Sequence, residues 1–236
     1  MKRWFLLLPL LAACSAPAPY ATTVGLLKPG ATMTVLVDGT TLGAYPPSNG
    51  QPRDLFTVAA TARSKASPPP PPHQRAAMGN LTVTAPPGLD SLLLRVPDGV
   101  DLTVHSLSGD VSIADITGNV RVVALHGNVT VVIPGYAQAA VGEGSITATM
   151  GSQSWPGTLR FSTAHGDVTI RLGANVAFRV HAHTGAGTIF NDFGLPGQAR
   201  GGAQNVSGVV NGGGAHAIDV EVTAGNVRLL HLQPQS

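Results

Sequence analysis

Charged side chains are scarce in this sequence. Lys, Arg, Asp and Glu make up 11% of its 236 residues, whereas soluble domains average about 25%. Long amphipathic helices are therefore not expected, because the face that such a helix turns to water is built from these residues. The 14 basic and 12 acidic side chains leave a formal charge of only +2, which provides no concentrated field for a phosphate backbone. Nucleic acid is therefore not an expected partner.

The sequence patterns of common catalytic centres are also missing. The chain has no Gly-x-Ser-x-Gly or His-Glu-x-x-His motif, no phosphate-binding loop and no cysteine pair. Aromatic residues amount to 5%, which leaves few platforms for sugar rings. Glu143, Asp192, Asp219 and Glu221 are too scattered to nominate as a catalytic pair. We therefore expect no enzyme activity and no cofactor, and a carbohydrate-active β-helix enzyme is the least favoured alternative.

A single cysteine, Cys14, excludes an internal disulfide. It follows a basic start at Lys2 and Arg3, an apolar run from Trp4 to Leu11 and two alanines. This is the order of an export signal. The apolar run is too short to span a bilayer, which needs about 20 such residues.

This segment ends in Leu-Ala-Ala-Cys at Cys14, a motif that resembles a bacterial lipobox. The resemblance implies cleavage after Ala13 and acylation of the cysteine, and several acyl chains would make the anchor effectively permanent. Ser15 after the cysteine favours the outer membrane where the host has one. An ordinary secretory signal with an incidental cysteine is the alternative. We predict a lipoprotein signal peptide over residues 1–13 and a tether over residues 14–30.

Residues 31–63 are predicted to contribute the first strands. The segments Met33 to Val37, Thr40 to Tyr45 and Leu55 to Ala62 are rich in β-branched and apolar residues. Asp38-Gly39 is a hairpin dipeptide, so the first two strands are expected to pair antiparallel. The three strands would form a small sheet.

Residues 64–78 contain five consecutive prolines, Pro68 to Pro72. Such a run adopts an extended polyproline conformation. We expect a long exposed loop or linker, with a docking site for an aromatic groove as the alternative.

From about residue 80 the sequence repeats a short unit: Gly, then Asp, Asn or Ser, then Val or Ile. Small or apolar residues recur seven, five and three positions before these glycines. This period of two predicts strands with one buried face, and the returning glycine predicts turns, where Gly adopts positive φ and Asp or Asn tolerates the left-handed region. The residues assigned this structural role are Gly109, Asp110, Gly118, Asn119, Gly127, Asn128, Gly144, Gly166, Asp167, Gly225 and Asn226.

A weaker copy of the unit begins at Gly187. Before it, Phe178, Val180 and Ala182 keep the register of the other copies with respect to Gly185. Irregular spacing elsewhere marks insertions. The predicted mobile loops are Pro134 to Ala137, Gly151 to Gly157 and Phe193 to Gly214.

Units of about nine residues cannot bury their apolar faces alone, so they are expected to stack. Two or so units would form one turn of a β-solenoid with Val, Ile and Leu ladders inside. We predict an all-β fold with this parallel β-helix-like architecture over residues 79–232. An antiparallel β-sandwich has turn signals at similar spacing and is the alternative. The residues expected on the outer face are Ser112, Arg121, Thr130, Thr147, Thr169 and Arg228.

Several segments of this region also carry a family resemblance. They are Ala-Pro-Pro-Gly at 85–88, a strand ending in Val-Pro at 92–97, and the strings Leu102 to Val111 and Leu159 to Val168. Together with the repeated Gly-Asn-Val steps they resemble the bacterial putative-adhesin family of β-strand-repeat domains of unknown function. The resemblance implies an extracytoplasmic β-helix-like domain, often tethered to membranes, without an assigned enzyme activity or functional residues.

Four residues are candidates for surface chemistry. His181 and His183 would place two imidazoles on one strand face, and His105 shares the register position of His181. Two histidines without an acidic residue between them supply too few ligands, so no metal is expected. Trp155 is the only tryptophan after the signal and is a further surface candidate.

These observations predict a lipid-anchored protein of the bacterial cell envelope. Its rigid β-repeat surface would bind an envelope protein or a glycan without catalysing a reaction, as the adhesin resemblance implies. The alternative is a regulatory partner of a membrane signalling protein that docks through the proline run at 68–72.

Overall fold

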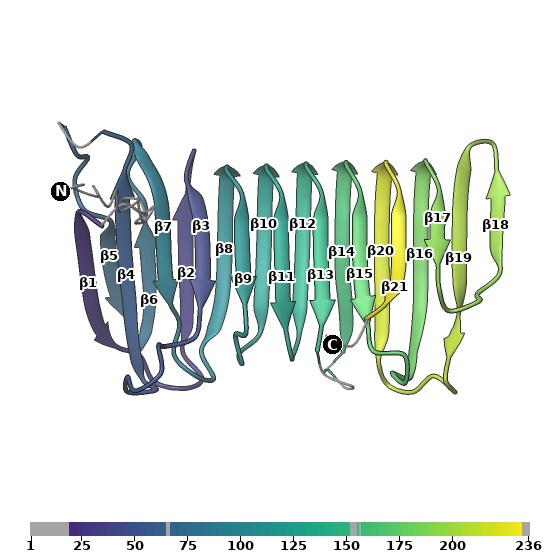
Figure 1. Ribbon diagram of the computed structural model, residues 1–236, viewed down its shortest axis with the longest axis horizontal. Coiled ribbons are helices and arrows are strands. Elements are labelled where there is room, and N and C mark those ends of the chain that lie inside the picture. Colours follow the sequence, from purple (N-terminus) through teal and green to yellow (C-terminus); the bar gives the residue numbers. More distant parts are fainter. Residues whose placement is uncertain (1–18, 65–66, 152–154, 156, 233–236) are drawn as a thin grey trace, which may run out of the picture.

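The computed structural model describes residues 19–64, 67–151, 155 and 157–232. Within these residues every extended regular element is a β-strand, which confirms the all-β prediction. The same residues contain no helix long and apolar enough to cross a membrane. The strands lie side by side along the longest axis of the molecule (Figure 1) and form two mixed sheets.

Sheet A has ten strands in the described part of the chain, and sheet B has eleven. In spatial order, sheet A consists of β1 (Ala21–Leu26), β4 (Leu55–Ala62), β7 (Leu89–Arg95), β3 (Thr41–Tyr45), β9 (Val111–Ala114), β11 (Val129–Ile133), β13 (Ile146–Met150), β15 (Val168–Leu172), β21 (Val227–His231) and β17 (Ile189–Asn191). Sheet B consists of β18 (Gly197–Arg200), β19 (Ala203–Val210), β16 (Phe178–Ala186), β20 (Ala217–Ala224), β14 (Thr158–His165), β12 (Ala137–Glu143), β10 (Val120–His126), β8 (Asp101–Ser108), β2 (Thr32–Val37), β6 (Asn80–Thr84) and β5 (His73–Ala77).

From β8 to β15 the chain alternates between the two sheets. Each strand pairs in parallel with the strand two places further along the chain. Val120 of β10, for example, pairs with Leu102 of β8 on one side and with Ala137 of β12 on the other. The glycine-marked units therefore contact one another through parallel pairs and not through hairpins.

The positions that the repeat predicts as buried form the core. Each is at most 5% exposed, and partners in neighbouring strands lie in register. A fully buried Val, Leu or Ile side chain contributes about 1.5–3 kcal/mol, so these columns are the main stabilising element of the stack. One column through sheet B contains Val104, Val122, Ala139, Phe161, Val220 and Ala182. The residues predicted outside are half-buried or exposed, as expected.

At the N-terminal end the stacking order departs from the chain order. β2 lies between β6 and β8, and β3 lies between β7 and β9. The predicted antiparallel hairpin of these two strands is wrong, because they belong to different sheets. Asp38-Gly39, with Gly39 at φ 62°, turns the chain from one sheet into the other and does not reverse it within a sheet.

The C-terminal end has the same kind of insertion. β20 pairs in parallel with β14 and β16, and β21 pairs in parallel with β15 and β17, so the last strands of the chain lie between earlier ones (Figure 1). The loop predicted over Phe193 to Gly214 is wrong for most of its length. It contains β18 and β19, which continue sheet B in antiparallel pairing.

The proline-rich segment is shorter as a loop than predicted. His73–Ala77 forms β5, which pairs antiparallel with β6 through a turn at Met78 and Gly79. Both turn residues have positive φ, 51° and 80°, which is typical of a tight hairpin turn. Pro72 is buried, and the Tyr20 hydroxyl donates a hydrogen bond to the Pro70 carbonyl oxygen at 3.0 Å. The proline run is thus held against the body of the protein.

Candidate functional site

Six glycines of the repeat, which do not include Gly118, lie over one another where the chain turns from sheet B into sheet A. All of them have φ between 110° and 152°. A β-carbon on Gly144 would lie 2.1 Å from the carbonyl oxygen of Gly127, and one on Gly225 would lie 2.0 Å from that of Gly166. The close approach and the positive φ both require glycine. This glycine column consists of Gly109, Gly127, Gly144, Gly166, Gly225 and Gly187.

The last member of the column corrects the predicted register of β16. Thr184 pairs with Val222, and a β-carbon on Gly187 would lie 2.0 Å from the carbonyl oxygen of Gly225. Gly187, and not Gly185, is therefore the turn glycine. Periodicity could not detect the difference, because a shift of two residues keeps the same side chains on the buried face.

The polar residues after these glycines form a hydrogen-bonded ladder along the same edge. Asp110 Oδ1 accepts hydrogen bonds from the backbone and side-chain nitrogens of Asn128 at 2.8 and 3.2 Å. Asn128 Oδ1 accepts a hydrogen bond from the Ser145 backbone at 3.0 Å. Asp167 Oδ1 accepts two from Asn226, at 2.8 and 3.1 Å. These oxygens satisfy backbone donors of the next unit, which is a structural role.

Gly118 and Asn119 lie at the opposite edge of the stack, where the chain returns from β9 to β10. A β-carbon on Gly118 would lie 2.0 Å from the Val100 carbonyl oxygen. Asp101 Oδ1 accepts hydrogen bonds from the backbone and side-chain nitrogens of Asn119 at 2.8 and 3.0 Å. The same motif therefore serves a second edge, and Gly118 is not part of the glycine column.

The histidine candidates fall in two places on the outer face of sheet B. His105 lies on β8 between Leu36 and Val123. His181 and His183 lie on β16, and β10, β12, β14 and β20 separate them from β8. The corrected register also places His183, and not His181, in the row of His105. The three imidazoles therefore do not form one site.

Two acidic residues that sequence reasoning did not connect with the histidines lie beside them. Asp219 pairs with His181, and Glu221 pairs with His183, because β20 is inserted next to β16. The sequence shows that Asp219 and Glu221 alternate with apolar Ile218, Val220 and Val222. It does not show that β16 is the neighbouring strand. The described residues contain no group of three His, Cys, Asp or Glu side chains that could hold a metal ion.

The imidazoles of His181 and His183 contact β19, the strand on the other side of β16. His181 Nδ1 lies 2.8 Å from Ser207 Oγ, and His183 Nδ1 lies 2.7 Å from Asn205 Oδ1. An amide oxygen can only accept, so the Nδ1 of His183 donates this hydrogen bond. The outer face of β16 and β20 is therefore a polar surface of donors and acceptors.

Of the two remaining candidates, one is buried and one lies outside the described residues. Trp155 is 3% exposed, and its Nε1 donates to the Ala217 carbonyl oxygen at 3.3 Å. Its ring packs against His216 at 5.2 Å between centroids. Trp155 therefore has a packing role and is not a surface site. Cys14 and the rest of the predicted signal peptide lie outside the described residues.

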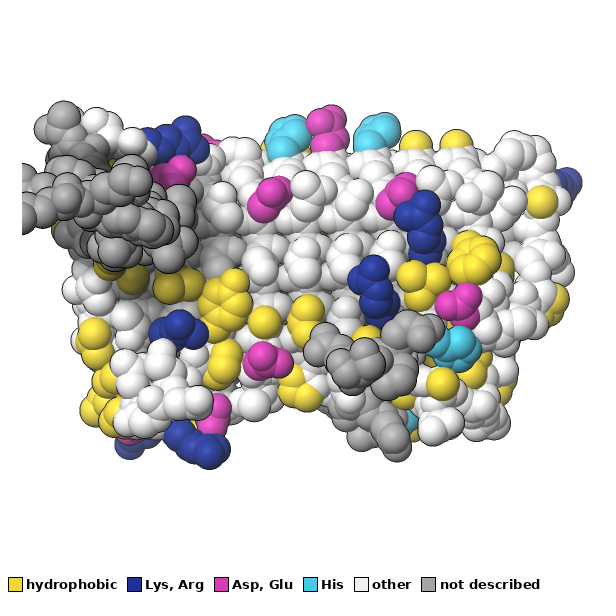
Figure 2. Space-filling model, in the orientation of Figure 1, with side chains coloured by type: hydrophobic (Ala, Val, Ile, Leu, Met, Phe, Trp, Pro, Cys, Tyr) yellow, Lys and Arg dark blue, Asp and Glu magenta, His cyan; other side chains and the backbone are white. Residues whose placement is uncertain are grey.

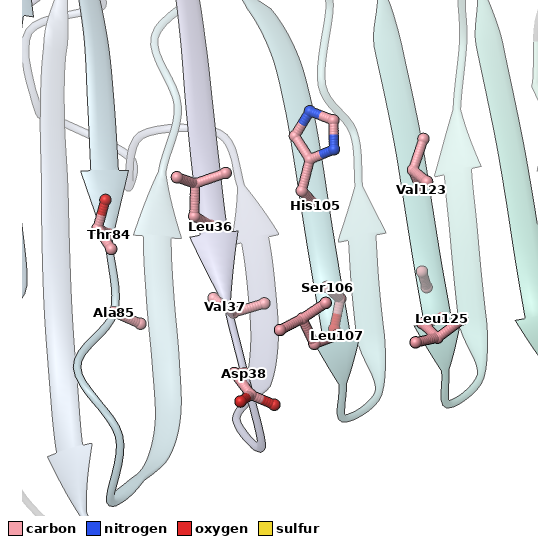
Figure 3. Close-up of a pocket in the computed structure, with 11 residues that line it drawn as sticks. Leu36, Val37, Asp38, Thr84, Ala85, His105, Ser106, Leu107, Val123 and Leu125 are labelled. Carbon is pink, nitrogen blue, oxygen red and sulfur yellow. The ribbon is translucent and has the colours of Figure 1, made fainter.

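An apolar groove of about 560 Å³ crosses the outer face of sheet B at β2, β8 and β10, near the glycine column. Figure 3 shows Leu36, His105 and Val123 in one row across these strands and Leu107 and Leu125 in the next. Leu107 is 58% exposed and Leu125 is 52% exposed. Large aliphatic side chains are thus held in water on a rigid sheet, where they are available to a partner.

Sequence reasoning missed this groove although a signal was present. Val123 and Leu125 stand at outward positions of the alternating pattern, where a polar residue is expected, and Leu107 does the same one unit earlier. β10 has two such outward aliphatic residues and β8 has one, so the groove becomes visible only when the strands are aligned side by side.

A second hollow of about 560 Å³ lies at the other end of the strands on the same face. Its lining is mixed, and its polar side chains include Thr103, Arg121 and Gln138, which lie in one register row. The Gln138 side-chain amide donates to the Tyr136 hydroxyl. The outer face of sheet B therefore carries an apolar groove at one end of these strands and a more polar hollow at the other.

The outer face of sheet A is different in kind. Its central row consists of short hydroxyl side chains in register. Figure 2 shows a white band, the colour of uncharged polar side chains and of the backbone, across the middle of the molecule. The residues of this row are Ser112, Thr130, Thr147 and Thr169.

Comparison with known proteins identifies a similar fold but no family. No family model matches the chain, and no curated protein matches its sequence. The solved structure of a putative cell adhesion protein from Clostridium sporogenes ATCC 15579 matches 90% of this chain and 99% of its own, with a TM-score of 0.53 and 9% identity. The solved structure of a putative adhesin from Bacteroides fragilis NCTC 9343 matches 90% of this chain and 96% of its own, with a TM-score of 0.34 and 9% identity. The chain is thus similar in fold to a bacterial putative cell adhesion protein.

Proposed function

We propose that this protein is a non-catalytic, adhesin-like binding protein of the bacterial cell envelope. Its two sheets form a β-solenoid with two strands per turn, an interpretation supported by the parallel pairing of strands two places apart. A solenoid of this kind is a stiff platform, because each turn is hydrogen-bonded to the turns on both sides. The similar fold of a putative cell adhesion protein agrees with this function.

The observation that carries the proposal is the apolar groove on the outer face of sheet B. Its aliphatic side chains come from three neighbouring strands and lie on a surface that cannot collapse to cover them. Such a groove fits apolar side chains of a protein partner better than a glycan, which is bound through aromatic platforms and hydrogen bonds. The partner is therefore a protein of the envelope or of another cell surface.

Binding to cells and to purified envelope proteins tests the proposal, and the chain offers a matched pair of variants. Val123 in the groove and Val132 on the outer face of sheet A are 37% and 38% exposed. Val123→Lys should reduce binding at least tenfold, whereas Val132→Lys should leave it unchanged. Both variants should melt like the unmodified protein, because both side chains point to solvent. Equal binding by the two variants would reject the groove as the binding site.

The same proposal places the protein on a membrane through lipid on Cys14. Acyl chains contribute about 0.8 kcal/mol per buried methylene, so a multiply acylated cysteine would hold the protein on the bilayer. Metabolic labelling with a fatty acid should mark the protein, and Cys14→Ser should remove the label and release the protein from the membrane fraction. Labelling that persists in the variant would refute the anchor and leave the groove experiment unaffected.

A further inference from the structure

The two sheets end in four edge strands, and these differ in their protection. An edge strand presents unpaired N–H and C=O groups, and proteins usually block it with charge, proline or shortness. At the C-terminal end, β17 has three residues and β18 has four, one of them Arg200. At the N-terminal end, β5 carries His73 and Arg75. Three of the four edges are thus short or charged.

The fourth edge, β1, has none of these features. It has six residues, Ala-Thr-Thr-Val-Gly-Leu, without a charge or a proline. It pairs antiparallel with β4 on one side, and no described strand pairs with its other side. Val24 is 54% exposed and Leu26 is 68% exposed. A strand of this length and composition is suited to pair with a further strand.

We propose that β1 pairs antiparallel with β1 of a second copy of this chain, so that the two A sheets form one continuous sheet across a two-fold axis. Antiparallel pairing of identical strands is self-complementary, and it closes the interface without leaving a new open edge. In the register centred on Val24, this residue lies opposite Val24 of the second copy, and Thr22 lies opposite the second copy's Leu26. The pairing covers both exposed aliphatic side chains of β1.

The edge strand of sheet B at the same end, β5, is less suited to such a joint. Pairing of β5 with β5 of a second copy would bring two copies of Arg75 close together. Like charges that face one another across strands are destabilising. Sheet B therefore stays separate, and the joint is carried by sheet A.

Cysteine cross-linking tests this register directly. With Cys14→Ser the chain has no thiol of its own, so Val24→Cys introduces a single one. Directly opposed residues of an antiparallel pair are about 4.5–5.5 Å apart between Cα atoms, which allows a disulfide. Mild oxidation should therefore convert Val24→Cys to a covalent dimer.

Leu26→Cys is the matched control, because its two copies would be four residues out of register and about 13 Å apart. It should remain monomeric alone and form a heterodimer when mixed with Thr22→Cys. Absence of the Val24→Cys dimer, or equal cross-linking by Leu26→Cys alone, would overturn the proposal.

The oligomeric state provides a second measurement without oxidant. Val24→Lys places a charge at the centre of the joint and should shift sedimentation of the full chain from dimer to monomer. Val209 is 56% exposed on β19, which is not an edge strand, and Val209→Lys should leave the dimer intact. A monomeric parent protein, or dimers in both variants, would contradict the inference. Neither result depends on the groove or on a partner protein.

Discussion

The middle of the stack and its two ends use the same unit in different orders. From β8 to β15 each new pair of strands lies on the pair before it in the chain. At the ends, β2 and β3 lie between pairs that follow them, and β20 and β21 lie between pairs that precede them. The parallel pairing continues through both arrangements. The glycine column continues only through the C-terminal one, because at the N-terminal end Thr40 takes the place next to Gly109. The repeat therefore determines the shape of each turn but not which turn becomes its neighbour.

This difference has a consequence for stability and folding. An inserted pair is hydrogen-bonded to other turns on both sides, so it cannot fray from the end of the stack by itself. Its contacts join distant parts of the chain, which slows folding relative to the locally connected middle. The ends are thus interlocked, while the middle is a simple repeat.

The largest effect is expected from a side chain in the glycine column of the middle. Gly144 has φ 142°, and a β-carbon there would lie 2.1 Å from the Gly127 carbonyl oxygen. Gly144→Val should cost at least about 4 kcal/mol of unfolding free energy, as measured by chemical denaturation. Gly187→Ala meets the same clash in the last turn and should mainly loosen β17. Gly135→Ala, with no neighbour within 4 Å, should change little. Equal losses for all three would show that the column is not tightly packed.

The second prediction concerns the buried and exposed faces of a middle strand. Val120 is 1% exposed between Leu102 and Ala137, so Val120→Asp buries a carboxylate without a partner. It should destabilise the protein by about 3 kcal/mol or more. Arg121→Asp, one residue further and pointing to solvent, should stay within about 0.5 kcal/mol of the parent. A thermal melt that finds the two variants equally stable would contradict the orientation of β10.

The middle was predictable because its information is local. A period of two identifies the buried face, and glycine identifies the turn, so the inward positions of β8, β10, β12 and β14 follow from the sequence. The order of the ends is not local. An Asp-Gly dipeptide is suited both to a hairpin within one sheet and to a turn between two sheets. The dipeptide at 38–39 therefore could not show that β2 and β3 do not pair.

The functional surface was predictable only in part, for the same reason. The outward positions were identified, but grouping them requires the neighbours of each strand. Leu107 and Leu125 form a groove because β8 lies beside β10, and His183 lies beside Glu221 because β20 is inserted next to β16. Trp155 was expected at the surface because its contact with His216, across 61 residues of chain, leaves no mark in the local sequence.

The third prediction tests whether the C-terminal insertion locks its neighbours. Ile218 of β20 is 1% exposed and pairs with Leu159 on one side and Val180 on the other. Ile218→Ala should cost about 2–4 kcal/mol and should increase amide exchange in both β14 and β16. Glu221→Ala, on the outer face of the same strand, should leave exchange in both neighbours unchanged. Faster exchange in β16 alone would mean that β20 belongs to the end and does not lock the middle.

The smallest effect is expected from the polar ladder, which supports the turns without filling the core. Asn128 donates to Asp110 and accepts from Ser145, so Asn128→Ala removes hydrogen bonds between three successive turns of the middle. Exposed hydrogen bonds of this kind contribute about 1 kcal/mol each in net stability, and water can replace part of the loss. Urea denaturation should therefore show a decrease of about 1 kcal/mol. Asn128→Asp should be worse than alanine, because it sets a second carboxylate against Asp110 where the amide donated. If aspartate were as stable as asparagine, the side-chain bond to Asp110 would have no part in holding adjacent turns together, and the backbone and the glycine column would account for the stacking alone.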